Sequence, residues 1–362
     1  MKIAQIAPLF ESVPPRLYGG TERVVSYLTE ELVRQGHEVT LFASGDSITA
    51  AKLVGCVPTA LRLTPAVQDH LPYHMIMLDR VREQADDFDI LHFHIDQFQY
   101  PMFRARETPI VTTLHGRQDL PDLNALYTYF NDMPLVSISD NQRLPVIDAN
   151  FHATIYHGLP LHLHKPTFDP RGGYVAFLGR ISAEKRPDLA ILIARSLGIP
   201  LKIAAKVDKT DQAYFRAEIE PLLDDPNVEF VGEINERDKT RFLGEALALL
   251  CPIDWPEPFG LVMIEAFACG TPVLAFRRGS VPEVVDDGVT GKIVNTLDEA
   301  IQTLPSVIAL DRRAVRRRFE ERFSVERMAK DYVRLYRALV SPAAVDEILL
   351  PSKIRTAIHA DQ

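Results

Sequence analysis

Short apolar runs alternate along the chain with longer segments whose apolar residues recur at helical spacing. In the first half, these runs have the composition of buried strands. We predict strands at 3–7, 38–43, 90–94, 110–114, 135–139 and 153–156. The first predicted helix follows Gly19-Gly20, with Thr21 as its N-terminal cap and Gly36 as the left-handed residue at its end. This alternation predicts a parallel sheet covered by helices.

A break between 159 and 173 separates this pattern from a second one. Prolines and the Gly172-Gly173 pair interrupt the alternation there, which is typical of a connection between domains. The second unit has predicted strands at 174–178, 201–205, 228–231, 248–251 and 273–275, and predicted helices at 187–197, 211–223, 261–268 and 325–339. We therefore expect an α/β fold with two doubly wound domains across a cleft, at 1–165 and 166–339. A tail at about 340–362 is free to pack back on the first domain.

Length and charge agree with two soluble domains and exclude one class of partner. The chain has 362 residues, more than one small core needs, and 46% of them are hydrophobic. Its formal net charge of −9 argues against nucleic-acid binding, which requires a dense basic surface. The arginine cluster at 312–318 is interpreted as the solvated face of a helix, because acidic residues follow it closely.

Cysteine usage and the apolar runs bear on location. Cys56, Cys251 and Cys269 are odd in number and lack metal or redox spacing, so we expect reduced core residues and a cytoplasmic protein. The N-terminal apolar run is too short for a signal peptide, and no run is long enough to span a bilayer. Membrane contact is expected to be peripheral at most.

Two cations follow the first strand of the second unit. In open parallel sheets, ligands bind beyond the carboxyl ends of the strands. Arg180 and Lys185 lie there, and a guanidinium fork with a nearby ammonium suits a diphosphate. The alternative is a strand-end pair that is solvated or bridged to Glu184.

A proline-held loop at 252–260 leads into the predicted helix at 261–268. Glu257 lies on the loop and Glu265 lies one turn inside the helix. Between them the free N–H groups of the helix N-terminus form an anion site. Carboxylates accept hydrogen bonds from paired hydroxyls, so Glu257 suits a sugar and Glu265 a ribose. A first-turn acid and a capping interaction are the alternative reading.

At these residues the sequence resembles the retaining GT-B glycosyltransferases of family 4. The resemblance covers nearly the whole chain and is most specific in its second half. It is carried by Glu257-Pro-Phe-Gly-Leu-Val-Met-Ile-Glu265, Ala266-Phe-Ala-Cys-Gly-Thr-Pro-Val273, Gly179-Arg180 with Lys185, the runs 279–285 and 288–291, and Tyr18-Gly-Gly-Thr-Glu-Arg23. One departure is His157-Gly158-Leu159-Pro160, where many members have an Asn-Gly-Val-Asp-like run.

The resemblance implies Rossmann-like domains and a role for each matching residue. Arg180 and Lys185 would hold the donor diphosphate, Glu257 the sugar hydroxyls and Glu265 the ribose. His115 would lie near the donor sugar and, with Arg180, Lys185 and Glu257, form the catalytic set. The remaining donor-binding residues would be Gly19, Gly20, Phe259, Gly260, Leu261 and Val262. No metal and no cofactor are expected on this reading, and the only Asp-x-Asp run, Asp87-Phe88-Asp89, precedes its predicted strand instead of following it. The leaving phosphate itself can accept the proton.

The expected reaction is transfer of a sugar, a hexose by expectation, from a nucleotide sugar to an acceptor hydroxyl with retention. A UDP-sugar such as UDP-glucose is the favoured donor and GDP-mannose the alternative. The acceptor is an unknown glycan, lipid-linked or small-molecule hydroxyl, and His94 and Asp96 are placed by hypothesis along its cleft. Two other classes stay open, a non-hydrolysing nucleotide-sugar epimerase and a non-catalytic sugar-nucleotide binder. A nicotinamide dehydrogenase is discounted, since no Gly-x-Gly-x-x-Gly turn follows the first strand.

Overall fold

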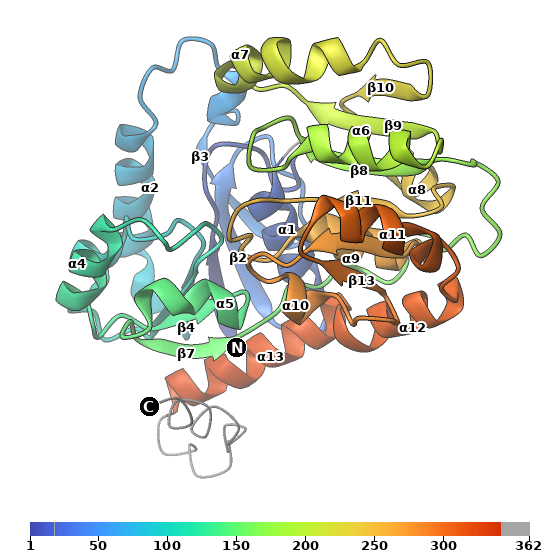
Figure 1. The fold of residues 1–362 in the computed structure, drawn as a ribbon. Helices are drawn as coiled ribbons and strands as arrows, with labels where there is room; N and C mark the ends of the chain where they lie inside the picture. The colour runs from blue at the N-terminus through green and yellow to red at the C-terminus, as the bar shows by residue number, and fades with distance from the viewer. Residues whose placement is uncertain (18, 342–362) are drawn as a thin grey trace, which may run out of the picture.

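The computed structural model describes residues 1–17 and 19–341; Tyr18 and the tail 342–362 lie outside the described residues. The chain forms two separate parallel sheets, the first on the left and the second on the right in Figure 1. The first has the order β3-β2-β1-β4-β5-β6-β7 and the second β10-β9-β8-β11-β12-β13. In each, the strand order reverses direction beside the first strand of the unit, so both are doubly wound. The expected α/β fold with two Rossmann-like domains is confirmed.

The strands and helices have the following bounds. The strands of the first sheet are β1 Lys2–Ile6, β2 Glu38–Ser44, β3 Lys52–Val57, β4 Ile90–Phe93, β5 Ile110–Thr113, β6 Leu135–Ser137 and β7 Phe151–Thr154. Those of the second are β8 Val175–Arg180, β9 Leu201–Lys206, β10 Val228–Gly232, β11 Leu249–Cys251, β12 Val273–Phe276 and β13 Gly291–Val294. The helices are α1 Gly20–Arg34, α2 Leu71–Glu83, α3 Tyr100–Phe103, α4 Asp122–Tyr129, α5 Asp140–Arg143, α6 Pro187–Ser196, α7 Gln212–Tyr214, α8 Glu236–Gly244, α9 Leu261–Ala268, α10 Val281–Val284, α11 Leu297–Ile308, α12 Arg312–Arg322 and α13 Val325–Val340.

The hydrophobic pattern did not predict two of the described strands, β3 and β13, and both lie at sheet edges. β3 includes the exposed Lys52 and Gly55, and β13 begins at Gly291, so neither shows a continuous apolar run. Gly291 is required by packing, because a Cβ there would lie 2.0 Å from the Val273 carbonyl oxygen of β12. The predicted cap of the first helix is also wrong. α1 begins at Gly20 with Gly19 at its N-cap, so Thr21 lies inside the first turn.

The last helix leaves the second domain and covers the first. Met328, Tyr332 and Tyr336 of α13 are buried in one cluster with Ile3 of β1 and Leu28 of α1. In Figure 1, α13 (red) runs from α12 toward the strands of the first domain. The return to the first domain thus begins at α13, within the range 166–339 that the sequence suggested for the second domain. The tail after 341 lies outside the described residues.

The two passages between the domains lie side by side. Leu159 on the outgoing segment exchanges backbone hydrogen bonds of 2.9 Å with Phe323 and Val325 on the returning one. Gly158 allows this approach, since a Cβ there would stand 2.3 Å from the carbonyl oxygen of Ser324. The His157-Gly158-Leu159-Pro160 run is therefore part of the outgoing connection between the domains, and it pairs with the returning connection through these hydrogen bonds.

The arginine cluster on α12 is a solvated face only in part, which corrects the sequence interpretation: Arg313 and Arg317 are exposed, but two other members are not. Arg312 and Arg316 are buried and donate to backbone carbonyls of neighbouring segments. Burial lowers the pKa of Arg312 to about 10, yet its carbonyl and hydroxyl acceptors satisfy the guanidinium. These two side chains fasten the last helices to the second domain.

Among the described helices, none combines the length and the apolar character that crossing a bilayer requires. All three cysteines are buried and unpaired, as expected of core residues.

Candidate active site

A cavity of about 560 Å³ lies between the domains, at the carboxyl ends of the central strands. Its wall contains every site residue expected from the sequence. The first domain contributes Gly19, Gly20 and His115, and the second contributes Arg180, Lys185, Glu257, Phe259, Gly260, Leu261, Val262 and Glu265. Residues more than 200 positions apart in the chain thus share one cavity.

The loop that carries Glu257 is fixed by two glycines. Gly260, with a φ of 80°, turns the chain into α9, a conformation that favours glycine. Gly279 lies so close that a Cβ would stand 2.3 Å from the Glu257 nitrogen. The Ser280 N–H then donates to the Glu257 carbonyl oxygen at 2.9 Å and the Ser280 hydroxyl donates to the Phe259 carbonyl oxygen at 2.9 Å. The run 279–285 therefore supports the Glu257 loop from behind.

Glu257, Lys185 and Trp255 form one interacting group. The Lys185 ammonium bonds the Glu257 carboxylate and lies 4.7 Å from the centre of the Trp255 ring. The Trp255 indole N–H donates to the same carboxylate oxygen at 2.9 Å. Glu257 is thus oriented before any ligand enters, beside a helix N-terminus whose first N–H groups have no intrahelical partners.

Arg180 is held loosely by three carboxylates. Its guanidinium nitrogens lie 3.6 Å from Glu184, 3.8 Å from Asp208 and 3.5 Å from Asp211. These separations exceed hydrogen-bond length, so the fork keeps donor capacity for a tighter acceptor. A diphosphate, with more charge and more acceptor atoms than any one of these carboxylates, is such an acceptor.

Glu265 belongs to an ionic network that joins the domains. Lys239 donates to Glu265 at 2.7 Å and lies 3.3 Å from Glu236. Arg23 of α1 reaches across from the first domain and lies 2.5 Å from Glu236, and His164 lies 3.2 Å from it on the other side. Burial alone would raise the pKa of Glu236, but His164, Lys239 and Arg23 outweigh it and lower the pKa to about 2.

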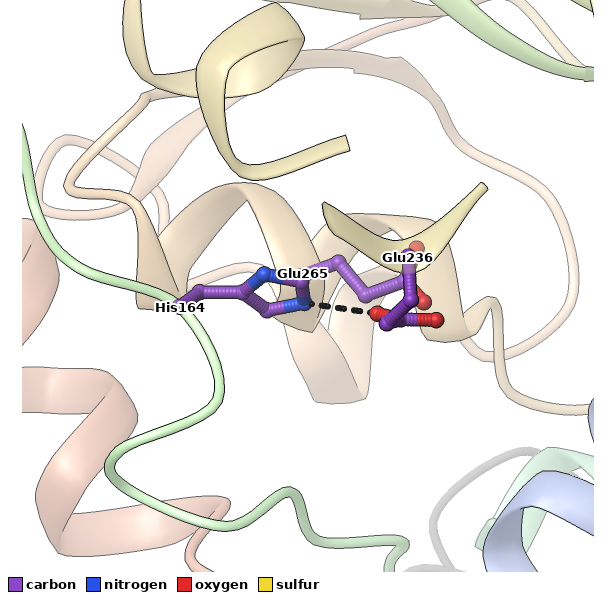
Figure 2. A group of neighbouring side chains, drawn as sticks. All are labelled: His164, Glu236 and Glu265. Atoms are coloured by element: carbon purple, nitrogen blue, oxygen red, sulfur yellow. Dashed lines mark ion pairs between the residues drawn. The ribbon is translucent and has the colours of Figure 1, made fainter. Parts of the chain in front are cut away.

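The same network contains a group with metal-ligand chemistry. His164, Glu236 and Glu265 place one ligand atom each within 4.8 Å of one another (Figure 2). Lys239 and Arg23 already bring two positive charges to the two carboxylates, so a divalent cation would have to displace the Lys239 ammonium. The charge balance therefore favours an ion-pair network at this position.

His115 ends a chain of buried histidines on the first domain. With the Gln5 amide oriented as it is here, His94 Nε2–H donates to Gln5 Oε1 at 2.8 Å, so His94 Nδ1 is an acceptor. His115 Nε2–H donates to it at 2.9 Å. His115 Nδ1 is then an acceptor, and no described residue bonds it. The ring stacks on His157, with 5.4 Å between centroids.

Burial keeps these histidines neutral. Desolvation lowers the pKa of His115 to about 3, and it lowers the pKa values of His94 and His157 well below the ordinary value of histidine. His92 continues the row toward Tyr336 of α13, 2.6 Å from its hydroxyl, and has a lowered pKa for the same reason. A neutral His115 can accept a hydrogen bond near the cavity but supplies no charge there.

The start of α1 lies against the start of α9. A Cβ on Gly20 would stand 3.5 Å from a Leu261 methyl group, so the two helix N-termini meet across the cavity. Glu283 of α10 closes a second contact by accepting the backbone N–H groups of Asp140 and Asn141 on the first domain, at 2.7 Å each. The two domains are therefore in contact at both places.

Sequence reasoning missed the partners of the expected residues. Lys239 and Glu236 lie on α8, 26 and 29 positions before Glu265, and no local pattern connects these elements. Trp255 was visible beside Glu257, but its bond to the carboxylate depends on the turn of the loop. His94 and Asp96 do line the cavity, as hypothesised.

Two facing doubly wound domains, with this cavity between them, define a GT-B fold. The family "Glycosyl transferases group 1" matches residues 162–321, and "Glycosyltransferase Family 4" matches residues 18–140. The D-inositol 3-phosphate glycosyltransferase of Mycolicibacterium gilvum (strain PYR-GCK) is 32% identical over 353 residues, which cover 81% of this chain and 78% of the relative. The chain belongs to the group 1 glycosyltransferases of family 4.

Other relatives act on different molecules. The N-acetyl-alpha-D-glucosaminyl L-malate synthase of Bacillus anthracis is 25% identical over 88% of this chain and 93% of its own length. The phosphatidyl-myo-inositol mannosyltransferase of Mycolicibacterium smegmatis (strain ATCC 700084 / mc(2)155) is 26% identical over 81% of both chains. The names of these relatives agree on glycosyl transfer but not on the sugar or the acceptor.

Solved structures share the fold. AviGT4, a glycosyltransferase involved in avilamycin A biosynthesis, superposes with a TM-score of 0.72 at 22% identity and covers 94% of this chain and 98% of its own. Anabaena HepE, solved in complex with UDP and glucose, gives a TM-score of 0.71 at 18% identity, with 94% and 100% covered. At these identities the likeness extends to the fold alone.

Proposed function

We propose that this glycosyltransferase moves a hexosyl group from a UDP-sugar such as UDP-glucose to an acceptor hydroxyl, with retention and without a metal ion. The observation that carries the proposal is the set of Arg180, Lys185, Glu257 and Glu265 around the N-terminus of α9 in one cavity. Two cations that suit a diphosphate share this cavity with two carboxylates that suit hydroxyl pairs. The UDP complex of HepE, which shares the fold, supports the choice of base.

In this reaction the acceptor hydroxyl attacks the anomeric carbon from the side that the leaving diphosphate vacates. The bond between the anomeric carbon and the phosphate oxygen breaks, the new glycosidic bond forms, and the hydroxyl proton passes to the departing phosphate. Arg180 and Lys185 offset the charge that grows on the leaving group. Glu257 holds the sugar, and Glu265 holds the ribose in place of its present partner Lys239.

A screen of nucleotide sugars tests this proposal. UDP, UDP-glucose, GDP and GDP-mannose are added to the chelator-treated protein, and thermal stabilisation and slow donor hydrolysis are measured. UDP-glucose is expected to raise the melting temperature by mass action and to be hydrolysed, with the α-anomer of glucose as the first product by NMR. If no nucleotide stabilises the protein, or if β-glucose forms first, the proposal is wrong.

A further inference from the structure

The first-domain wall of the cavity has its own chemistry, separate from the donor residues. It contains an aromatic band of Phe10, His74 and Phe98, with 5.0 Å between the first two rings and 5.8 Å between the last two. His74 is fixed on both sides, because Nε2 accepts the Leu9 N–H at 3.1 Å and Nδ1 donates to the His70 carbonyl at 2.9 Å. Phe98 is 40% exposed, so part of its ring stays open where it lines the cavity.

Asp96 lies beside this band in a conformation that few residues adopt. Its φ is 54°, in the left-handed region, and such strain collects at functional sites. Buried Gln99 holds the turn by donating to the Asp96 carbonyl at 2.9 Å and to the Thr112 hydroxyl at 2.6 Å. The backbone is therefore fixed, and the side chain lines the cavity.

The Asp96 carboxylate has no counter-charge. Within residues 1–17 and 19–341, no hydrogen bond or ion pair joins it to another side chain. It stays open to the cavity, while surrounding protein atoms desolvate it and raise its pKa to about 6. A carboxylate in this state has both oxygens available to hydroxyl donors.

The cations on the same wall, Arg23 and Arg62, each have a carboxylate beside them. Arg23 is bound to Glu236 at 2.5 Å and to the Leu17 carbonyl at 2.7 Å. Arg62 lies 3.5 Å from Glu11 and over the Phe10 ring at 5.5 Å. The charges of Arg23 and Arg62 are thus balanced, and the charge of Asp96 is left over on this wall, where it would repel an acceptor that carries phosphate or carboxylate.

We propose that the acceptor is an uncharged polyhydroxylated ring, such as a terminal sugar, which stacks on the exposed Phe98 ring of this band and donates two hydroxyl hydrogen bonds to Asp96. This inference rests on the proposed function and names the acceptor class for the same cavity. It sets the chain apart from relatives whose names specify inositol 3-phosphate or L-malate.

Ligand-observed saturation-transfer NMR on the full chain, saturated with UDP, tests the inference. The probes are methyl α-D-glucopyranoside, methyl α-D-mannopyranoside and myo-inositol, against inositol 3-phosphate and L-malate. At least one neutral ring is expected to bind and the two anions are not. The pair myo-inositol and inositol 3-phosphate differs only in the phosphate, so tighter binding of the phosphate would overturn the inference. Binding by no neutral ring would overturn it too.

Substitutions test whether the neutral ring binds at the first-domain wall of the cavity. Asp96→Asn keeps the size of the side chain and is expected to weaken binding of the neutral ring by roughly 10-fold, the effect of losing hydrogen bonds to a charged group. It should also improve binding of inositol 3-phosphate, because repulsion is removed. Phe98→Ala should weaken only the neutral ring. The controls are Asp122→Asn and Tyr129→Ala on α4, outside the cavity, and unchanged neutral-ring affinity in Asp96→Asn would contradict the proposal.

Two further experiments identify the source of the acceptor ring and distinguish a failure of the acceptor inference from a failure of the proposed function. Octyl and methyl glucosides carry the same ring, so tighter binding of the octyl form would indicate a lipid-linked source and equal binding a free saccharide or glycan. Calorimetry with UDP reports the donor site independently. If UDP fails to bind the wild type, the proposed function fails; if UDP binds all variants equally and the ring preference is anionic, only the acceptor inference fails.

Discussion

The two walls of the cavity differ in how their charges are arranged. On the second-domain wall, each expected donor residue has an opposite charge near it, as in the Lys185–Glu257 and Lys239–Glu265 pairs. On the first-domain wall, Asp96 stands without a counter-charge and the histidines are neutral. Paired charges suit a ligand that carries both a diphosphate and hydroxyl groups, and an unpaired carboxylate among aromatic rings suits a neutral ring.

Loss of the Lys185 cation should give the largest effect. In the proposed reaction Lys185 offsets the charge on the leaving diphosphate, so turnover in Lys185→Ala should fall by about 10²–10³ fold, as for other groups that stabilise transition-state charge. Steady-state kinetics with the donor identified in the screen measures this. Lys202→Ala on β9 is the matched control, since Lys202 pairs with Glu229 outside the cavity. A similar loss in both variants would mean that the charge acts on folding, not on the leaving group.

The histidine row predicts how stability depends on pH. Unfolding returns the pKa of each buried histidine to about 6.5, so the unfolded chain binds more protons below that pH. Stability should be full above pH 6.5 and fall by up to about 1.4 kcal/mol per pH unit for each histidine as the pH drops toward the folded value, about 3 for His115.

Melting temperatures between pH 7 and pH 5 measure this decline. His115→Gln removes one titrating group and should flatten the slope, whereas His162→Gln changes an exposed side chain and should leave the slope unaltered. An equal slope in wild type and His115→Gln would show that His115 is not held neutral.

The Arg23–Glu236 contact should give the smallest effect. This ion pair joins α1 of the first domain to α8 of the second, and the exposed fractions of the two side chains are 9% and 23%. Arg23→Gln should cost about 1 kcal/mol or less in stability, because Lys239 and His164 remain beside Glu236. Small-angle scattering should show a more open average arrangement without nucleotide. An unchanged scattering profile would indicate that other contacts, such as Glu283 with α5, hold the domains alone.

Local patterns were sufficient to predict many of the residues that line the second-domain wall of the cavity. Helix α9 begins and ends where its apolar pattern does, and Gly260 marks the turn into it. The family motif then placed Glu257 and Glu265 on opposite sides of that turn. Their separation along the chain is short, so local geometry largely determines where they lie.

Contacts between distant segments could not be predicted. Arg316 looked like a surface residue because nothing in its neighbourhood shows that Leu161 and Ala268 present their carbonyls to it. α13 was recognised as amphipathic, but its pattern does not say which domain its apolar face covers. Edge strand β3 was missed because only its last two residues are buried, so it has no continuous apolar run.

Calorimetric titration of UDP and UDP-glucose into wild type, Glu257→Ala and Glu265→Ala tests the central claim most directly. If Glu265 holds the ribose and Glu257 the sugar, Glu265→Ala weakens both ligands, while Glu257→Ala weakens UDP-glucose and leaves UDP close to wild type. Equal losses of UDP and UDP-glucose in Glu257→Ala, or unchanged UDP affinity in Glu265→Ala, would contradict the assignment of these two carboxylates.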